Sequence, residues 1–247
     1  MTIIDMRPDA LRAAAKAVLD AGGRMQMVYA WRPDSVHSEL RYVLTESADA
    51  PFCTWRCPPD NVPSLATVWP LLSWYEREIT DLHGIHFDGQ PEPYPLVRHD
   101  GLEEAEDSMA DKRHTALPEL SGDDTNVQLL PFGPVRADVM ESAEFLFFYT
   151  GETIIHYQPQ LFFKHRAMER RFEGLPAAAG VTLAERVSGV SSVAHSLAYC
   201  EAIESACQCR IPARARQLRV LLAEMERLYN HLHYLGHLSH TTTLKVA

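Results

Sequence analysis

The stretch RMQMVYAWR, residues 24–32, decides the fold class of the first part of the chain. It is rich in aromatic and long apolar residues, and the runs LRYVLTE (40–46) and FCTWRC (52–57) share that character. Clusters of Pro, Asp and Ser separate the runs as turns do, so we predict a small antiparallel sheet. Residues 8–21 and 64–82 carry apolar residues at helical spacing on either side of it. The pattern therefore predicts a small α/β sandwich, with helices over a sheet.

The remainder of the chain changes character twice. Residues 88–126 are rich in Pro, Gly, Asp and Glu and poor in large apolar residues, which is typical of a linker. From residue 127, two strand-like runs meet at the turn sequence YTGE (149–152), and helices follow. We expect one helix to begin at a capping box formed by Thr182 and Glu185.

A second helix over 212–236 carries leucines at helical spacing, and the two helices should form an antiparallel hairpin. The predicted fold class is α+β. Its parts are a domain over 1–87, a linker over 88–126, and a mainly helical domain with a short β region over 127–247.

Composition excludes several classes of protein. The 247 residues include 33 acidic and 23 basic side chains, a net charge of −10, so a nucleic-acid partner is disfavoured. The five cysteines form no disulfide framework, which favours a reducing, cytoplasmic compartment. The N-terminus does not resemble a signal peptide, and no apolar run approaches the length that spans a bilayer. We expect no direct membrane insertion, so any link to a membrane goes through a partner.

Few local patterns indicate chemistry. Glu224, Arg227, His231 and Tyr234 share one helical face, which is more typical of a solvated face with i,i+3 and i,i+4 pairs than of a site. The histidines that follow lack a carboxylate to complete a metal site. The sequence has no Gly-rich phosphate loop and no GxSxG or HExxH motif.

The stretch ERVSGVSSVAHS, residues 185–196, poses a specific question. Its small residues lie three apart and a histidine follows them. Two interpretations remain open on spacing alone: a metal site that has lost its strongest ligands, or a seam of small residues between packed helices.

A family resemblance extends over nearly the whole chain. YEREITDLHGIHFDGQPEPYPLVRHDG (75–101) resembles the end of the C-type peripheral-arm protein of NADH–quinone oxidoreductase, respiratory complex I. FGPV, YTGETI, KHRAMERRFEG, ERVSGVSSVAHSLAYCEAIE and LLAEMERLYNHLHYLG resemble, in this order, motifs of the D-type protein of complex I and of the large subunits of energy-converting nickel–iron hydrogenases. A C-like unit fused to a D-like unit resembles the large subunit of formate-hydrogenlyase-type enzymes. Relative to that family the chain looks truncated, with the C-terminal half of the D-like domain absent.

The resemblance bears on metal binding at the quoted stretch. Nickel-binding relatives carry a CxxC where this chain has Ser188 and Ser191, and a serine hydroxyl is a poor substitute for a thiolate at a soft metal site. We therefore expect no metal ligands here and no hydrogen activation. His195 matches the hydrogenase pattern and is a candidate catalytic residue, with a structural core histidine as the alternative.

Glu169 matches a family glutamate beside the active cavity, in HRAMER, where relatives usually have glycine at the position of Ala167. A buried carboxylate there could have a raised pKa and relay protons, which makes Glu169 the second candidate catalytic residue. The alternative is a surface glutamate paired with Arg166 or Arg170.

The loop after the FGPV motif is the candidate cofactor-binding segment, through Gly133, Pro134, Arg136 and Asp138. In the D-type protein of complex I this loop carries a histidine that approaches the quinone headgroup, and here no histidine is present. The chain itself is expected to bind no cofactor, with quinone as the one candidate ligand of the cavity.

The resemblance also implies partners. We expect an iron–sulfur small subunit that holds the clusters, membrane-arm subunits, and peripheral attachment to the inner face of the cell membrane. NADH would bind a different protein of the complex, and the chain should be inactive alone. The leading hypothesis is a nickel-free large subunit that contributes to electron transfer coupled to proton or ion translocation. The alternative is a non-catalytic scaffold, assembly subunit or truncated remnant.

Overall fold

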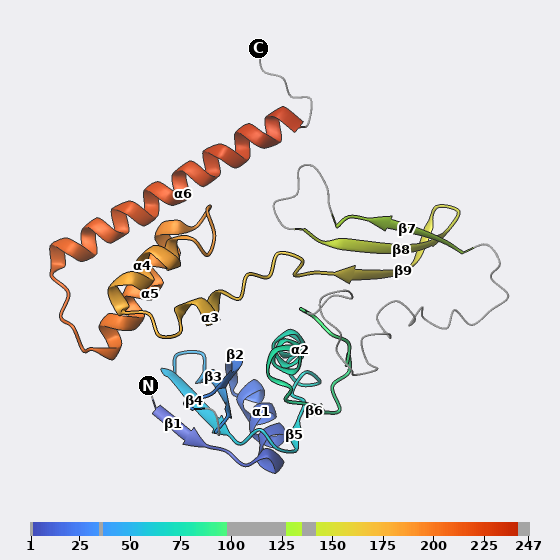
Figure 1. Cartoon of the computed structure of the whole chain (residues 1–247), viewed down its shortest axis with the longest axis horizontal. Coiled ribbons are helices and arrows are strands. Elements are labelled where there is room, and N and C mark those ends of the chain that lie inside the picture. Colours follow the sequence, from blue (N-terminus) through green and yellow to red (C-terminus); the bar gives the residue numbers. More distant parts are fainter. Residues whose placement is uncertain (1, 35–36, 98–126, 135–141, 242–247) are drawn as a thin grey trace. The chain divides into compact units, whose positions relative to one another are not determined.

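The structure is a computed structural model that describes residues 2–34, 37–97, 127–134 and 142–241 (Figure 1). Residues 98–126 of the predicted linker therefore lie outside the described residues. Contacts divide the chain into two compact units, residues 1–165 and 166–247. The sequence analysis placed the start of the second domain earlier, at residue 127.

The first unit opens with a four-stranded sheet. Its strands are β1 (Thr2–Asp5), β2 (Gly22–Trp31), β3 (Glu39–Ser47) and β4 (Phe52–Cys57), in the order β1-β4-β3-β2. The three predicted strands pair in antiparallel fashion. The sequence analysis missed β1, which pairs with β4 in parallel and aligns Thr2 with Cys53. A four-residue strand with such a distant partner leaves almost no local signal.

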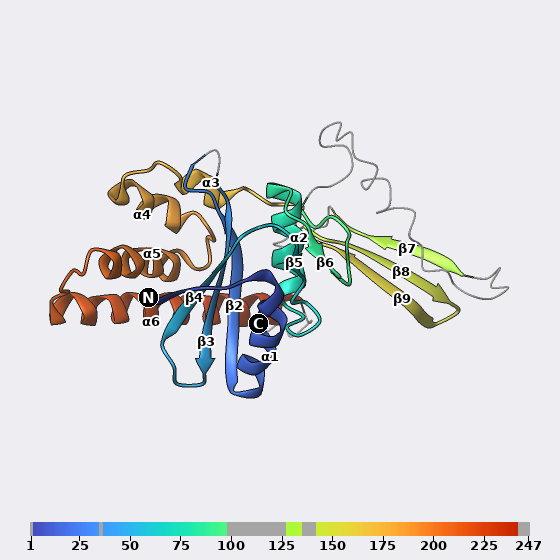
Figure 2. The same cartoon turned by 90° about the horizontal axis from the view of Figure 1, so that it is seen from below.

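Two helices cover one face of this sheet (Figure 2). They are α1 (Leu11–Asp20), preceded by the 3₁₀ turn η1 (Pro8–Ala10), and α2 (Leu72–His83). Leu11, Tyr42 and Leu72 are among the fully buried side chains that form the core between the layers. The predicted α/β sandwich is confirmed, although α2 begins at Leu72 and not at residue 64.

Residues 88–97, the described part of the predicted linker, pack against the first domain. The two-residue strands β5 (Val62–Pro63) and β6 (Phe87–Asp88) pair in parallel. Further along, Leu96 is buried, and its backbone N–H donates to Asp81 Oδ2 of α2 at 2.7 Å.

A three-stranded antiparallel sheet follows, with β8 at its centre. Its strands are β7 (Gln128–Phe132), β8 (Glu144–Thr150) and β9 (Thr153–Gln160). The predicted hairpin turn is confirmed between β8 and β9. Gly151 has φ +61°, in the left-handed region that glycine adopts at no steric cost.

The second unit is helical. Its helices are α3 (Met168–Phe172), α4 (Ala177–Glu185), α5 (Ser192–Ala206) and α6 (Ala213–Thr241). The predicted capping box is wrong, because Thr182 and Glu185 lie in the second half of α4 and the next helix begins only at Ser192. The predicted antiparallel pair of α5 and α6 is confirmed. The end of α5 meets the start of α6 through the ion pair of Glu204 with Arg219, 2.5 Å.

The content of strands and helices agrees with the predicted α+β class. Within the described part of the chain, no helix combines the length and apolar character needed to cross a bilayer.

Candidate functional site

Ser188 and Ser191 lie in one tight turn between α4 and α5. The backbone N–H of Ser191 donates to the carbonyl oxygen of Ser188 at 3.1 Å. His195 follows on the first turn of α5, where its N–H donates to the Ser191 carbonyl at 3.0 Å. All three residues are half-buried. The structure therefore brings three of the predicted site residues into one short segment, residues 186–194 and the histidine after it, and we call residues 186–194 the serine loop.

Side chains from outside the serine loop hold its backbone carbonyls. Arg166 donates from Nη1 to the carbonyl of Arg186 at 3.0 Å and from Nη2 to the carbonyl of Val187. Asn230 of α6 donates from Nδ2 to the carbonyl of Val190 at 2.6 Å. Arg166, which the sequence analysis considered as an ion-pair partner of Glu169, has its guanidinium directed to this loop instead. The loop is thus anchored on both flanks of Ser188.

The backbone amides at the end of the loop bind a buried carboxylate, Glu226. Val193 N–H donates to Glu226 Oε1 at 2.7 Å, and Ala194 N–H donates to Oε2 at 2.9 Å. These amides lie in the first turn of α5, where a helix has no internal acceptor for them. The Glu226 residue is only 5% exposed, although it lies on a helix whose apolar side chains are largely exposed in this chain.

Sequence reasoning missed Glu226. Two residues earlier on α6, Glu224 belongs to the polar face that the sequence did indicate, and it pairs with Arg227 at 3.2 Å. A two-residue step turns the side chain to another side of the helix. The only signal that could have found Glu226 is the absence of a local capping side chain at the true start of α5.

Glu169 lies in the first turn of α3 and is exposed in this chain. The buried environment that would suit a proton relay is not formed by the described residues around it. Ala167 immediately before this helix has φ +49° and ψ +50°, which is the left-handed conformation. This explains in physical terms why glycine suits the position better than alanine.

The candidate cofactor loop is described only at its beginning. Gly133 has φ +107°, and a Cβ added there would lie 2.1 Å from the carbonyl oxygen of Ala143, so only glycine fits. Pro134 follows it, and neither residue carries a polar side chain. Arg136 and Asp138 lie outside the described residues, so the predicted polar contacts of this loop stay a prediction.

The donor set does not fit a nickel–iron centre. At ordinary pH the hydroxyls of Ser188 and Ser191 stay protonated, and they offer hard oxygen in place of the soft thiolate that such a centre needs. Across the described ranges, no group of three or more His, Cys, Asp and Glu side chains is placed to hold a metal ion. We therefore derive no chemical step through such a centre.

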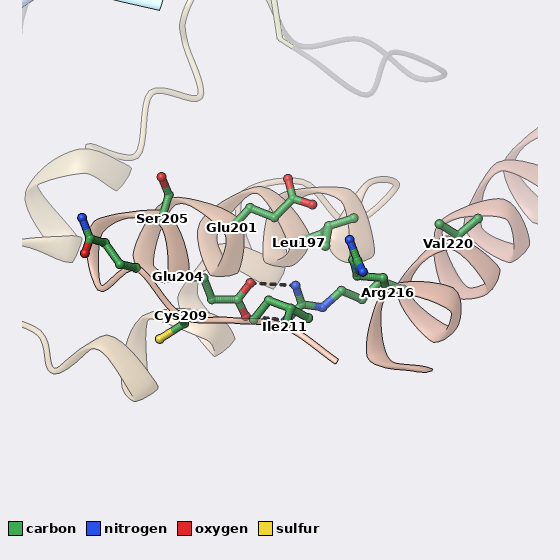
Figure 3. Close-up of a pocket in the computed structure, with 10 residues that line it drawn as sticks. Leu197, Glu201, Glu204, Ser205, Cys209, Ile211, Arg216 and Val220 are labelled. Carbon is green, nitrogen blue, oxygen red and sulfur yellow. Dashed lines mark hydrogen bonds and ion pairs between the residues drawn. The ribbon is translucent and has the colours of Figure 1, made fainter. Parts of the chain in front are cut away.

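A cavity of about 570 Å³ lies between α5 and α6, away from the serine loop (Figure 3). The bidentate pair of Glu204 and Arg219 lies at this cavity, and Leu197 and Ile211 line it. None of the predicted site residues lines this cavity.

The 75–101 signature has a structural explanation in the first unit. Polar side chains of α2 bind the chain that follows the helix: Arg77 Nε donates to the carbonyl of Tyr94 at 2.8 Å, and Asp81 accepts from two backbone amides at 2.7 Å. Glu76 is fully buried and accepts from Ser64 Oγ at 2.6 Å. The described part of this signature acts as a clasp within the fold, and these contacts account for its unusual density of charged residues.

Family comparisons agree with this division of the chain. Residues 4–107 match the family described as "Respiratory-chain NADH dehydrogenase, 30 Kd subunit", and residues 166–243 match the family described as "Nickel-dependent hydrogenase". The chain joins one domain of each family. The family resemblance expected from the sequence is confirmed.

Individual relatives show the same fusion. Formate hydrogenlyase subunit 5 of Escherichia coli (strain K12) is 33% identical over 226 residues, 83% of this chain and 40% of that protein. Hydrogenase-4 component G of the same strain is 33% identical over 190 residues, 70% of this chain and 34% of the relative. The C/D fusion protein of NADH-quinone oxidoreductase from Rhodopseudomonas palustris (strain BisA53) is 28% identical over 210 residues, 72% and 36% of the two chains. The fused chain thus spans between about a third and two fifths of the length of these curated relatives.

Proposed function

We propose that the fused chain is a nickel-free large subunit of a hydrogenase-related or complex-I-related oxidoreductase complex. The observation that carries this proposal is the pair of family matches in the order 30 kDa subunit, then hydrogenase. Relatives named as hydrogenase and NADH-quinone oxidoreductase subunits share that order. The absence of thiols at positions 188 and 191 supports the nickel-free part of the proposal.

In this proposal the second unit contributes one wall of an electron-transfer cavity. His195 and the serine loop supply part of it, Glu169 relays protons at its edge, and the segment from Gly133 to Asp138 is the candidate contact for quinone. Because the described residues of that segment carry no polar side chain, no step through quinone is derived from them. Electrons would come from clusters on an iron–sulfur partner, and membrane-arm subunits would hold the complex at the inner face of the membrane.

A non-catalytic scaffold is the second candidate function. The same two serines favour it, because they remove the ligands of the family's metal while leaving the surrounding helices folded. A scaffold would retain interfaces with partner subunits and lack electron transfer.

Affinity purification of the native protein from its own membranes, followed by mass spectrometry, separates the two. The proposal predicts recovery of an iron–sulfur subunit and membrane subunits, and electron transfer by the recovered complex. A complex with these partners but without electron transfer would favour the scaffold, and a protein recovered without partners would contradict the proposal.

The proton role of Glu169 is tested by Glu169→Gln in the same complex. The change removes the titrating group and keeps the shape, so turnover should fall by about tenfold or more, within the range usual for general acid–base groups. Glu173→Gln, at the C-terminal end of the same short helix, is the matched control. Unchanged turnover in Glu169→Gln would remove the proposed role.

A further inference from the structure

The serine loop is shaped by side chains that reach it from distant positions. Within it, the described hydrogen bonds of its backbone include the single turn between Ser188 and Ser191. Its flanks depend on Arg166, Asn230 and Glu226, which approach from two different segments of the second unit. Residues 186–191 belong to no helix or strand, so this segment takes its conformation from tertiary contacts.

Glu226 differs from the other two anchors in charge and in burial. It is a carboxylate at 5% exposure whose two oxygens each accept one backbone amide of α5. Tyr229 Oη donates to Oε1 at 3.3 Å as well. The positive end of the α5 dipole lies at the same place and favours the negative charge. Loss of this acceptor would leave the amides of Val193 and Ala194 without a partner.

The position of His195 follows directly from these contacts. The residue comes next after Ala194, whose amide Glu226 binds, and its own amide donates to Ser191. A shift of the first turn of α5 therefore moves His195 and the serine turn together.

We propose that Glu226 is a positioning residue for the electron-transfer cavity: it fixes the first turn of α5 and, through it, Ser191 and His195. This inference rests on the proposed function of the complex, and it adds a residue outside the cavity that sets the cavity's geometry. Glu226 itself exchanges no proton or electron in this role.

The first half of the test is amide hydrogen exchange of the full chain, measured at single residues. The Glu226→Ala change should accelerate exchange at Val193 and Ala194 by at least tenfold and leave the first unit unchanged. Glu226→Gln keeps one carbonyl oxygen as acceptor and should restore part of the protection. Glu224→Gln, an exposed glutamate on the same helix, is the control and should change neither amide. Unchanged exchange in Glu226→Ala overturns the inference.

The second half measures turnover of the assembled complex from reduced methyl viologen to a short-chain quinone. Glu226→Ala should lower kcat by at least tenfold while the complex keeps the same partners, and Glu226→Gln should recover part of it. Faster exchange with an unchanged kcat would make Glu226 a helix cap alone and overturn its positioning role. A wild-type complex without turnover would instead refute the proposed function, and the inference with it, so the two failures are distinguishable.

Discussion

The clasp residue Glu76 makes the stability of the first unit depend on pH in a way that can be measured. Burial raises the pKa of this carboxyl from 4.5 to about 7, while hydrogen bonds from Ser64 and Leu65 and the charge of Arg12 oppose the shift. Folded Glu76 therefore holds its proton in a pH range where the unfolded chain has already released it. Unfolding releases a proton between these two pH values, so the free energy of unfolding falls as the pH rises from 4.5 to about 7 and levels off above.

The size of the effect follows from the two pKa values. At about 1.4 kcal/mol per pH unit, a carboxyl shifted to this extent lowers the stability by about 3 kcal/mol between the two ends of the range. This is a large fraction of the ~5–15 kcal/mol that stabilises an ordinary domain. Glu76→Gln removes the titrating group, so its stability should lose this part of the pH dependence, whatever its level at any one pH.

Urea unfolding of the full chain between pH 4.5 and 8, followed by tryptophan fluorescence, measures this directly. All four tryptophans lie in the first unit, so the signal reports its unfolding alone. The exposed Glu46→Gln is the control and should keep the wild-type slope. Other acids titrate in both proteins, so the decisive quantity is the difference between wild type and Glu76→Gln. A difference that is flat with pH, or one of opposite sign, would refute the assignment of Glu76 as a buried acid.

Backbone geometry in the second unit gives three further predictions. Ala167→Gly should stabilise it by about 0.5–1 kcal/mol, because alanine is strained at φ +49°; a loss of stability in urea unfolding followed by circular dichroism would contradict this. Gly180→Ala should destabilise it by about 1–3 kcal/mol, since the new Cβ would lie 2.1 Å from Tyr199 Oη; an unchanged midpoint would show that α4 and α5 can separate freely. Gly236→Ala, in a helical position with no atom within 4 Å, should stabilise α6 by about 0.5–1 kcal/mol, and a lower melting temperature would refute its helical conformation.

Local patterns predicted the parts of the fold that local interactions determine. The turn at Gly151 and the helix before Gly22 follow from backbone preferences and spacing, and both were found where expected. The capping-box pattern of Thr182 and Glu185 misled because the same residues also fit the interior and end of α4. The sequence carries no signal that distinguishes these two placements.

The candidate site divides in the same way. Ser188, Ser191 and His195 were found from the sequence because they lie in one short segment that resembles a known motif. Glu226 could not be found, because its partners lie 32 and 33 positions away along the chain. A buried carboxylate that binds two amides becomes recognisable only once the helices are packed.

The central claim of this account is that the chain is a large subunit without nickel. The measurement that tests it most directly is the metal content of the native complex, purified from its own membranes through this chain. The account predicts iron from the clusters of a co-purified small subunit and no nickel above background. Stoichiometric nickel in that complex would contradict the interpretation of Ser188 and Ser191 and return hydrogen activation to consideration.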